Sequence, residues 1–415
     1  RSNICIKIAD NKESISYSEF QFLIALAEQC FLNEYIYSQS IEDNISIKKI
    51  IKKCQCGEIN EQNISILACF FPLYKLLDEI KLLKTFDSNE KHFKELIKLN
   101  ILDPLKEIEL SQRIKKIGSI NDDISRKVKS QYEENPYPRW KAEDPHKYLK
   151  TSCIQAINTE ISPNIIKSKL MSNQIKVLIA GCGTGRQILQ AQRYINAQIT
   201  GIDLSSSSLS YAQRKINELG IKNVELIQMD ILEVDLLKEE FDIIECAGVL
   251  ICMKDPNLGL KKLLNVSKKN SFLKLGLYSE LARQDIVNAR EYIYSKSLKP
   301  TNKDMRSFRN DVISGQFPEI QNINLRNDFY SFSSCRDLCF HVQEHRFTID
   351  KLQETLISHK LKFLGFLLPQ PVKALYNQYF PEDKDQTNLK NWAKFETKFP
   401  NTFRAMYQFW VTNNS

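Results

Sequence analysis

The sequence contains no apolar run approaching the roughly 20 residues that a membrane-spanning helix requires, and its N-terminus carries no secretory signal. Its eleven cysteines are an odd number and lack the spacing of a secreted disulfide scaffold. This pattern favours reduced thiols and a cytoplasmic protein without membrane partners. The chain begins with Arg1 rather than Met, so we expect its natural N-terminus to lie upstream.

No basic block alternates with aromatic residues, and no internal repeat recurs at a fixed period. The formal net charge of +8 is modest for this length, so nucleic acid is not indicated as a partner. What the chain does contain is material for substantial cores, because 42% of its 415 residues are hydrophobic. This length predicts two or three domains.

The most informative feature is an apolar run that ends in three alternating glycines, Gly181, Gly183 and Gly185. Glycine is expected where a buried strand turns into a helix and a ligand approaches the backbone. A dinucleotide-binding turn prefers a small residue where this chain has Arg186. The Gly-x-Gly-x-Gly spacing instead resembles motif I of the class I S-adenosylmethionine-dependent methyltransferases. An NAD-binding or purely structural α/β domain is the alternative interpretation.

The segments that follow support this resemblance. A second strand is expected at 198–204, and it ends in Asp203, 22 residues after Gly181. An acid in this place can accept hydrogen bonds from both ribose hydroxyls. A helix is expected at 205–219, and further strands at 224–232, 241–250 and 272–279. The resemblance implies that Asp230 meets the adenine amino group and that Ile231 lies beside the ring.

The resemblance thus implies a site for S-adenosylmethionine. Its expected residues are Gly181, Cys182, Gly183, Gly185, Asp203, Leu204, Asp230, Ile231 and Cys246, joined by Tyr132 and Arg139 from the preceding connector. The connector, Gln131 to Trp140, contains two prolines that favour an extended path. It is either a stiff linker packed on the domain or a lid that closes over cofactor or substrate.

The remaining segments complete a predicted Rossmann-like, seven-stranded class I methyltransferase sheet with a helical N-terminal domain and a cap insertion. A capping box is expected at Ser18 to Gln21, and apolar helical stretches at 64–83 and 93–102, the last ended by Asp103-Pro104. A helix at 349–360 and strands at 361–368 and 406–411 resume the sheet. The predicted domains are 1–126 (helical), 127–150 (connector), 151–280 (cofactor-binding core), 281–348 (cap on the substrate side) and 349–415 (completion of the core).

Five segments together resemble a bacterial family in which this methyltransferase module commonly follows tetratricopeptide repeats. They are Phe22 to Tyr35, Gln131 to Trp140, Gly276 to Arg283, Cys335 to Thr348 and Met406 to Val411. The resemblance spans nearly the whole chain. It implies a protein partner, either for the N-terminal helices or for repeats that precede Arg1.

The cap contains His341-Val-Gln-Glu344-His345, which fits the His-x-x-Glu-His pattern of some zinc proteases. On a helix, two His residues four apart can share a metal, and Cys335 and Cys339 could join them. The favoured hypothesis has no metal. In it, His341, Glu344 and His345 line the acceptor pocket together with Tyr278, and a neutral His removes the acceptor's proton.

The sequence therefore predicts an enzyme that moves a methyl group from S-adenosylmethionine to an O or N atom of a protein side chain or small molecule. The alternative is a non-catalytic module that holds the cofactor for regulation and carries a helical protein-interaction domain.

Overall fold

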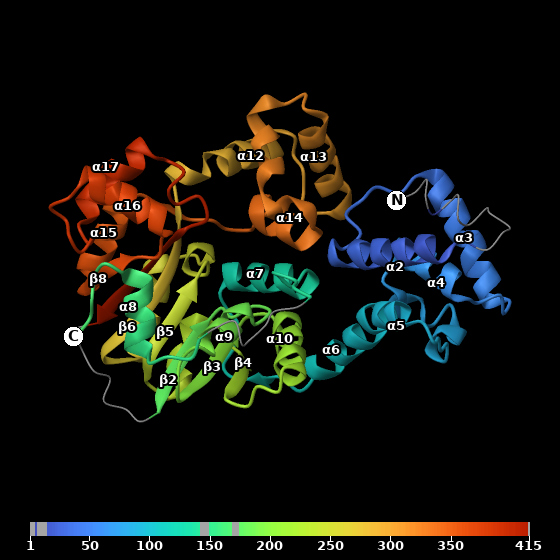
Figure 1. Ribbon diagram of the computed structural model, residues 1–415, viewed down its shortest axis with the longest axis horizontal. Helices are drawn as coiled ribbons and strands as arrows, with labels where there is room; N and C mark the ends of the chain where they lie inside the picture. The colour runs from blue at the N-terminus through green and yellow to red at the C-terminus, as the bar shows by residue number, and fades with distance from the viewer. Residues whose placement is uncertain (1–4, 6–14, 142–148, 168–173, 414–415) are drawn as a thin grey trace. The chain divides into compact units, whose positions relative to one another are not determined.

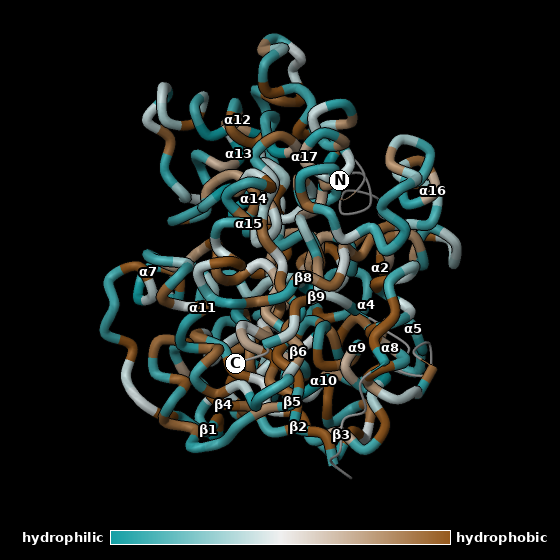
Figure 2. The backbone as a smooth tube through the Cα atoms, turned by 90° about the vertical axis from the view of Figure 1, so that its left-hand side faces the viewer, coloured by the Kyte–Doolittle hydropathy of each residue, from teal (hydrophilic) through white to brown (hydrophobic). Residues whose placement is uncertain are grey.

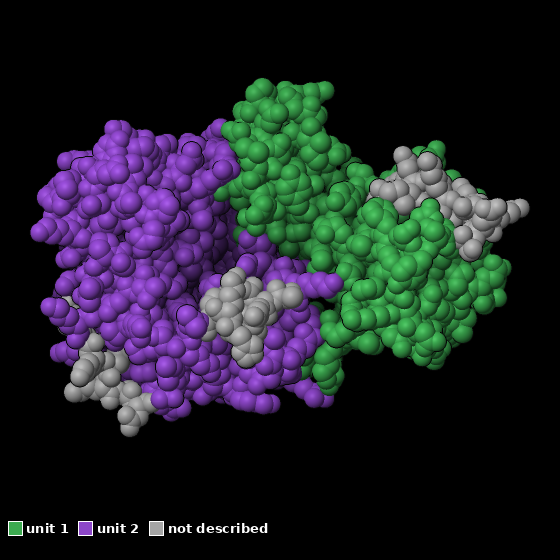
Figure 3. All heavy atoms as spheres, viewed as in Figure 1, with its two compact units in different colours: residues 1–112, 292–340 green, residues 113–291, 341–415 purple. Residues whose placement is uncertain are grey.

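The computed structural model describes Cys5 and residues 15–141, 149–167 and 174–413. Its contacts divide the chain into two compact units (Figure 3). Unit 1 combines residues 1–112 with 292–340, and unit 2 combines 113–291 with 341–415. Most of the predicted cap insertion, 281–348, therefore groups with the N-terminal helices. The boundaries of the two units differ from those of the domains predicted from the sequence.

Unit 2 is built on one nine-stranded sheet, which confirms the predicted α/β class (Figure 1). Its path runs β1-β4-β3-β2-β5-β6-β9-β8, and β7 pairs with β6. The strands are β1 (Lys115–Lys116), β2 (Ile175–Ala180), β3 (Ala197–Asp203), β4 (Val224–Gln228), β5 (Phe241–Ala247), β6 (Ser267–Ser279), β7 (Arg346–Phe347), β8 (Leu361–Phe366) and β9 (Tyr407–Asn413). All pairs are parallel except those that β9 forms with β6 and β8.

The seven predicted strands correspond to β2, β3, β4, β5, β6, β8 and β9, and the two-residue strands β1 and β7 are additions. The principal helices of unit 2 are α7 (Asp123–Glu134), α8 (Cys153–Ile161), α9 (Arg186–Ala191), α10 (Ser206–Glu218), α11 (Pro256–Asn265), α15 (Ile349–Ser358), α16 (Gln370–Tyr379) and α17 (Leu389–Lys398), and α12 (Gln284–Ser295) leads out of the unit. The α10 helix starts where the sequence predicts, because Ser205 caps it by accepting from the Ser208 backbone N–H.

The two faces of the sheet have separate apolar cores, as expected when helices cover both faces. Phe409 and Trp410 are neighbours in β9, yet Phe409 belongs to one core and Trp410 to the other. This alternation follows from the two-residue period of a strand. Apolar stretches of the backbone tube run along the central strands (Figure 2). The sheet is therefore a rigid platform for the loops at its carboxyl edge.

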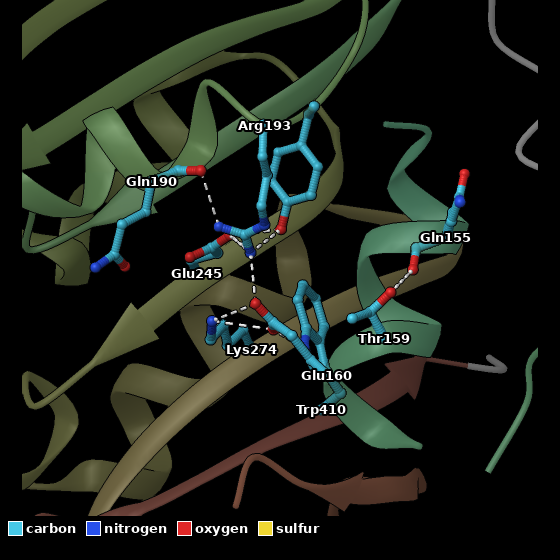
Figure 4. Close-up of polar contacts among 9 residues, drawn as sticks. Gln155, Thr159, Glu160, Gln190, Arg193, Glu245, Lys274 and Trp410 are labelled. Carbon is cyan, nitrogen blue, oxygen red and sulfur yellow. Dashed lines mark hydrogen bonds and ion pairs between the residues drawn. The ribbon is translucent and has the colours of Figure 1, made fainter. Parts of the chain in front are cut away.

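A network of ion pairs ties α8 to the sheet (Figure 4). Arg193 Nη2 lies 3.0 Å from Glu245 of β5 and 3.3 Å from Glu160 of α8. Glu160 also lies 3.1 Å from Lys274 of β6 and accepts a 2.7 Å hydrogen bond from Trp410 of β9. Burial alone raises the pKa of Glu245, but Arg193 and Lys274 outweigh burial and lower it. The two cations and two carboxylates of the network balance, so it leaves no net charge inside the fold.

Unit 1 is helical. It contains α2 (Tyr17–Leu32), α3 (Ile41–Gln55), α4 (Glu61–Ala68), α5 (Lys91–Ile97), a π-helical turn (Lys98–Leu102), α6 (Asp103–Ser111), α13 (Asn302–Ser314) and α14 (Phe332–Cys339). Polar contacts hold its two segments together, because Arg306 Nη2 donates to the Tyr35 carbonyl at 2.7 Å and the Ser333 N–H donates to the Glu34 carboxylate. No helix in the described part of the chain is long and apolar enough to cross a membrane.

Several local predictions for the helices were wrong. The capping box uses Ser16 and Glu19 rather than Ser18 and Gln21. Asp103-Pro104 begins α6 instead of ending a helix, because proline is tolerated in a first helical turn. The helix α3 and the pair α16 and α17 were not predicted.

Candidate functional site

The turn after β2 carries the three glycines in left-handed conformations. Gly181, Gly183 and Gly185 have φ of +74°, +51° and +88°. Glycine reaches this region at no steric cost, whereas another residue would be strained. Gly185 is the N-cap residue that immediately precedes α9. The turn is therefore a tight strand-to-helix connection at the carboxyl edge of the sheet, as predicted.

The space beside each glycine is taken by the protein itself. A Cβ on Gly181 would lie 2.3 Å from Val249, and one on Gly185 would lie 2.8 Å from Ala212 of α10. A Cβ on Gly183 would lie 3.0 Å from the Tyr137 carbonyl oxygen. From their spacing, these glycines are expected to let a ligand approach the backbone. The structure shows that backbone conformation and close packing already require them.

Asp203 ends β3 beside this turn. Its Oδ2 accepts from the Gly183 N–H at 2.9 Å, and its Oδ1 accepts from the Ser205 N–H at 2.9 Å. Burial raises the pKa of Asp203 to about 6, and the nearby Glu133 adds to this, while the backbone hydrogen bonds oppose it. A carboxylate has about four lone-pair sites, so acceptor capacity remains beside the backbone hydrogen bonds from Gly183, Leu204 and Ser205. The carboxylate is thus fixed in place with acceptor capacity remaining.

Asp230 follows β4 and lies under α7. It is 3% exposed, and its Oδ1 accepts from the Leu232 N–H at 3.0 Å. Burial raises its pKa, although hydrogen bonds from Leu232 and from the Ser125 hydroxyl of α7 oppose the shift. The neighbouring Ile231 is buried. The end of β4 therefore presents a carboxyl group next to an apolar side chain.

Two predicted cofactor residues turn their side chains into the core. Cys182 and Cys246 are both buried, and burial raises the pKa of each thiol, that of Cys246 to about 12. Cys182 lies beside Gly201 in the core on one face, and Cys246 belongs to the core on the other. Only their backbone atoms are left to meet a ligand. Leu204 is half-buried, and its carbonyl accepts from Gln228 at 2.8 Å.

The connector packs across the glycine turn. The Trp140 indole N–H donates to the Thr184 carbonyl at 3.2 Å, and the Trp140 backbone N–H donates to the Tyr211 hydroxyl at 3.1 Å. The Thr184 hydroxyl in turn donates to the Pro138 carbonyl. Arg139 is half-buried within this part of the connector. The first four residues of the predicted connector, 131–134, form the last turn of α7, and the two prolines follow that helix.

The same helix end joins α10. Glu133 accepts from the Ser206 N–H at 2.8 Å and the Ser207 N–H at 3.1 Å, and it also accepts from both hydroxyls. Burial alone raises the pKa of Glu133, but these hydrogen bonds together lower it. A carboxylate at the N-terminus of a helix is also favoured by the helix dipole. Glu133 thus fixes α7 next to Asp203.

Tyr132, the preceding residue, reaches the predicted catalytic segment. Its hydroxyl lies 3.2 Å from His341 Nε2. His341 is buried, and its Nδ1 accepts from the Gln343 N–H at 3.2 Å. The neutral ring therefore carries its proton on Nε2 and donates it to Tyr132. Both ring nitrogens of His341 therefore form hydrogen bonds within unit 2.

Residues 341–345 are not helical, contrary to the helix assumed for the His-x-x-Glu-His pattern, because α14 ends at Cys339. Within the described ranges, no group of three or more His, Cys, Asp and Glu side chains is arranged to hold a metal.

Glu344 forms an ion pair with Arg283. The guanidinium donates from Nη2 at 2.7 Å and from Nε at 3.2 Å, and both side chains are at most 4% exposed. Arg283 also stacks on Tyr278, with 3.5 Å between its Cζ and the ring centroid. The strand pairing of β6 with β7 places Tyr278 beside Arg346. These groups brace the segment that follows β6 against the segment that contains His341.

His345 faces the loop after β5. Its backbone N–H donates to the Ile251 carbonyl at 2.8 Å, and its Nε2 lies 3.0 Å from the Met253 carbonyl. The amide nitrogen of Gln343 also lies 3.0 Å from Nε2. Because the Met253 carbonyl only accepts and an amide nitrogen only donates, the two contacts favour opposite tautomers of the His345 ring.

Sequence reasoning missed two polar residues at this edge, Glu133 and Gln187. Glu133 lies in the predicted connector, and only the folded chain brings it to α10. Gln187 follows the glycine turn, and its Nε2 donates to the Ala247 carbonyl at 3.4 Å. No sequence spacing signals either contact, because each joins separate elements.

Comparison with known proteins agrees with this geometry. Residues 171–320 match the model of a family described as a methyltransferase domain. An uncharacterized protein of Synechococcus sp. is 29% identical over 201 residues, 46% of this chain and 48% of that protein. A probable (S)-tetrahydroprotoberberine N-methyltransferase 2 of Papaver bracteatum is 35% identical over 98 residues, 23% of this chain and 27% of that protein.

Among solved structures, PKMT2 from Rickettsia typhi in complex with AdoHcy is similar with a TM-score of 0.47 and 19% identity, over 67% of this chain and 54% of that chain. The chain spans about half or less of the length of these relatives. The domain match covers the glycine turn, Asp203 and Asp230. Residues 171–320 thus match a methyltransferase domain, and the predicted fold class and the predicted cofactor, S-adenosylmethionine, agree with that match.

Proposed function

We propose that the protein is an enzyme that transfers the methyl group of S-adenosylmethionine to an O or N atom of a protein side chain or small molecule. The observation that carries the proposal is Asp203, whose carboxylate is anchored by the Gly183 and Ser205 N–H groups at the carboxyl edge of the sheet. In open α/β sheets ligands bind at this edge.

The residues present fit the cofactor. Asp203 has lone pairs left for the ribose hydroxyls, and Asp230 with Ile231 offers an acceptor and an apolar surface for the adenine. The backbone of Gly181 to Gly185 lies between Asp203 and the end of β5. Tyr132 comes from the last turn of α7, and Arg139 comes from the part of the connector that packs across the turn. When bound, the cofactor supplies an activated sulfonium methyl group, so alignment of the acceptor accounts for most of the catalysis.

We propose His345 as the group that takes the acceptor's proton. Supporting this, its Nε2 is oriented by the Met253 carbonyl in the loop after β5. His341, Glu344 and Tyr278 were grouped with it in the prediction, but their internal contacts suit them to positioning. His341 orients Tyr132, and Glu344 with Tyr278 holds Arg283.

Of the two candidate acceptor atoms, we propose nitrogen as the one to test first. Two relatives from Papaver are N-methyltransferases by name, a probable (S)-tetrahydroprotoberberine N-methyltransferase 2 and an N-methyltransferase 4. An ammonium group must lose a proton before its nitrogen can attack the methyl group, and a His side chain can accept that proton. We also propose a protein partner for unit 1, on the resemblance to modules that follow tetratricopeptide repeats.

The proposal is tested by incubating the protein with methyl-labelled S-adenosylmethionine and cell lysate, and then fractionating the products by size. We expect label in an acceptor fraction, and transfer slowed about 100-fold or more by His345→Ala with cofactor affinity within about twofold of wild type. His359→Ala, at the end of α15, is the matched control and keeps full transfer. Cofactor binding without any labelled product would favour the non-catalytic module instead.

A further inference from the structure

The chain reverses its winding direction between β2 and β5. These strands are parallel neighbours, but β2 leads to β3 on one side, whereas β5 leads to β6 on the other. Connections that run in opposite directions open a crevice above the two carboxyl ends. The glycine turn forms one wall of this crevice, and Ala247 at the end of β5 forms the other.

Gln187 spans this crevice. It lies in the first turn of α9, two residues after Gly185, and its Nε2 donates to the Ala247 carbonyl at 3.4 Å. The carbonyl can only accept, so the amide nitrogen faces β5 and the amide oxygen faces the other way. The orientation of this side chain is thus set by the strand end.

The amide oxygen is left without a partner. Gln187 Oε1 is buried and accepts no hydrogen bond within the part of the chain that the structure describes. A buried acceptor in this state is costly, and a native protein normally satisfies it with a ligand or water. The missing partner must be a hydrogen-bond donor.

The strand order identifies which donor fits. Asp203 ends β3, on one side of the glycine turn, and Ala247 ends β5, on the other side. If Asp203 holds the ribose, the amino-acid part of the cofactor extends toward the crevice between β2 and β5. We propose that Gln187 Oε1 accepts a hydrogen bond from the α-ammonium group of S-adenosylmethionine. This inference rests on the proposed function and adds a residue that determines affinity for the cofactor's amino group.

The test measures the binding of two ligands by calorimetry. One is S-adenosylhomocysteine, and the other is its analogue with the α-amine replaced by hydrogen. Gln187→Leu is expected to weaken S-adenosylhomocysteine binding about tenfold or more, since it removes a hydrogen bond to a charged group. It is expected to leave the affinity for the deaminated analogue within about twofold of wild type. The difference between the two effects isolates the contact.

Gln190→Leu, one turn later on α9, is the matched control and changes neither affinity. Unchanged S-adenosylhomocysteine binding in Gln187→Leu overturns the inference, and so does an equal loss for both ligands, which would reflect a disturbed glycine turn. A wild-type protein that binds neither ligand contradicts the proposed function itself. Circular dichroism of Gln187→Leu establishes that the variant is folded.

Discussion

At the scale of single residues, burial governs the ionisation of Asp203. Removal from water disfavours its charged form, and the carboxylate of Glu133 adds to this, so its pKa rises to about 6. Ribose hydroxyls donate hydrogen bonds, and they therefore prefer the ionised carboxylate. A cofactor held by Asp203 must consequently compete with a proton at mildly acidic pH.

We predict that affinity for S-adenosylhomocysteine is constant above about pH 7 and falls about tenfold per pH unit below about pH 6. Calorimetric titrations between pH 5 and 8 measure this. Asp203→Asn should bind weakly without the step at pH 6. A wild-type affinity that does not change over the range would contradict the assigned role of Asp203.

The predicted loss of affinity below pH 6 cannot be explained by Asp203 destabilising the folded protein at low pH. Its folded pKa of about 6 lies above the ordinary value, so the folded chain binds more protons than the unfolded chain between about pH 4 and pH 6. The contribution of Asp203 to the stability of the cofactor-free protein therefore increases as the pH falls through this window. Loss of affinity there reflects the site rather than loss of the fold at Asp203.

The residues that the sequence predicted are those whose roles depend on local spacing. Gly181, Gly183 and Asp203 lie where the strand–turn–helix pattern placed them. Glu133 and Gln187 could not be found in this way, because their partners lie 73 and 60 residues away in the chain. The side-chain directions of Cys182 and Cys246 depend on which sheet face each core occupies, which spacing near a turn does not determine.

At the scale of elements, α7 is the part of the site whose structure differs most from the sequence prediction. The sequence predicted a connector from residue 127 onward, whereas residues 123–134 form a helix and the two prolines follow it. The helix contacts the end of β4 through Ser125, the start of α10 through Glu133, and His341 through Tyr132. It therefore links the predicted cofactor and acceptor sides.

We predict that Glu133→Gln loosens α7. The variant keeps the shape of the side chain but loses the charge at the N-terminus of α10, which costs about 1–2 kcal/mol for a half-buried group. Hydrogen exchange of the α7 amides should become about tenfold faster. Glu134→Gln, on the exposed side of the same helix, should leave exchange unchanged. Equal protection in both variants would show that Glu133 does not hold the helix.

At the scale of the whole molecule, the order of the sheet was predictable and the grouping of the units was not. Alternating strand and helix patterns, with a final antiparallel strand at Met406 to Val411, determine the class of fold. The association of residues 292–340 with the N-terminal helices depends on contacts such as those of Arg306 with Tyr35 and of Glu34 with Ser333. These contacts join segments about 270 and 299 residues apart, and no local pattern reports them.

The measurement that tests the central claim most directly is a calorimetric titration of S-adenosylmethionine into the wild-type protein and Asp203→Ala at pH 7.5. The account predicts a dissociation constant on the order of micromolar for the wild type. It predicts a loss of about 100-fold or more in the variant, because a charged acceptor of two hydrogen bonds is removed. The same affinity in both proteins, or no binding by a folded wild-type protein, would contradict it.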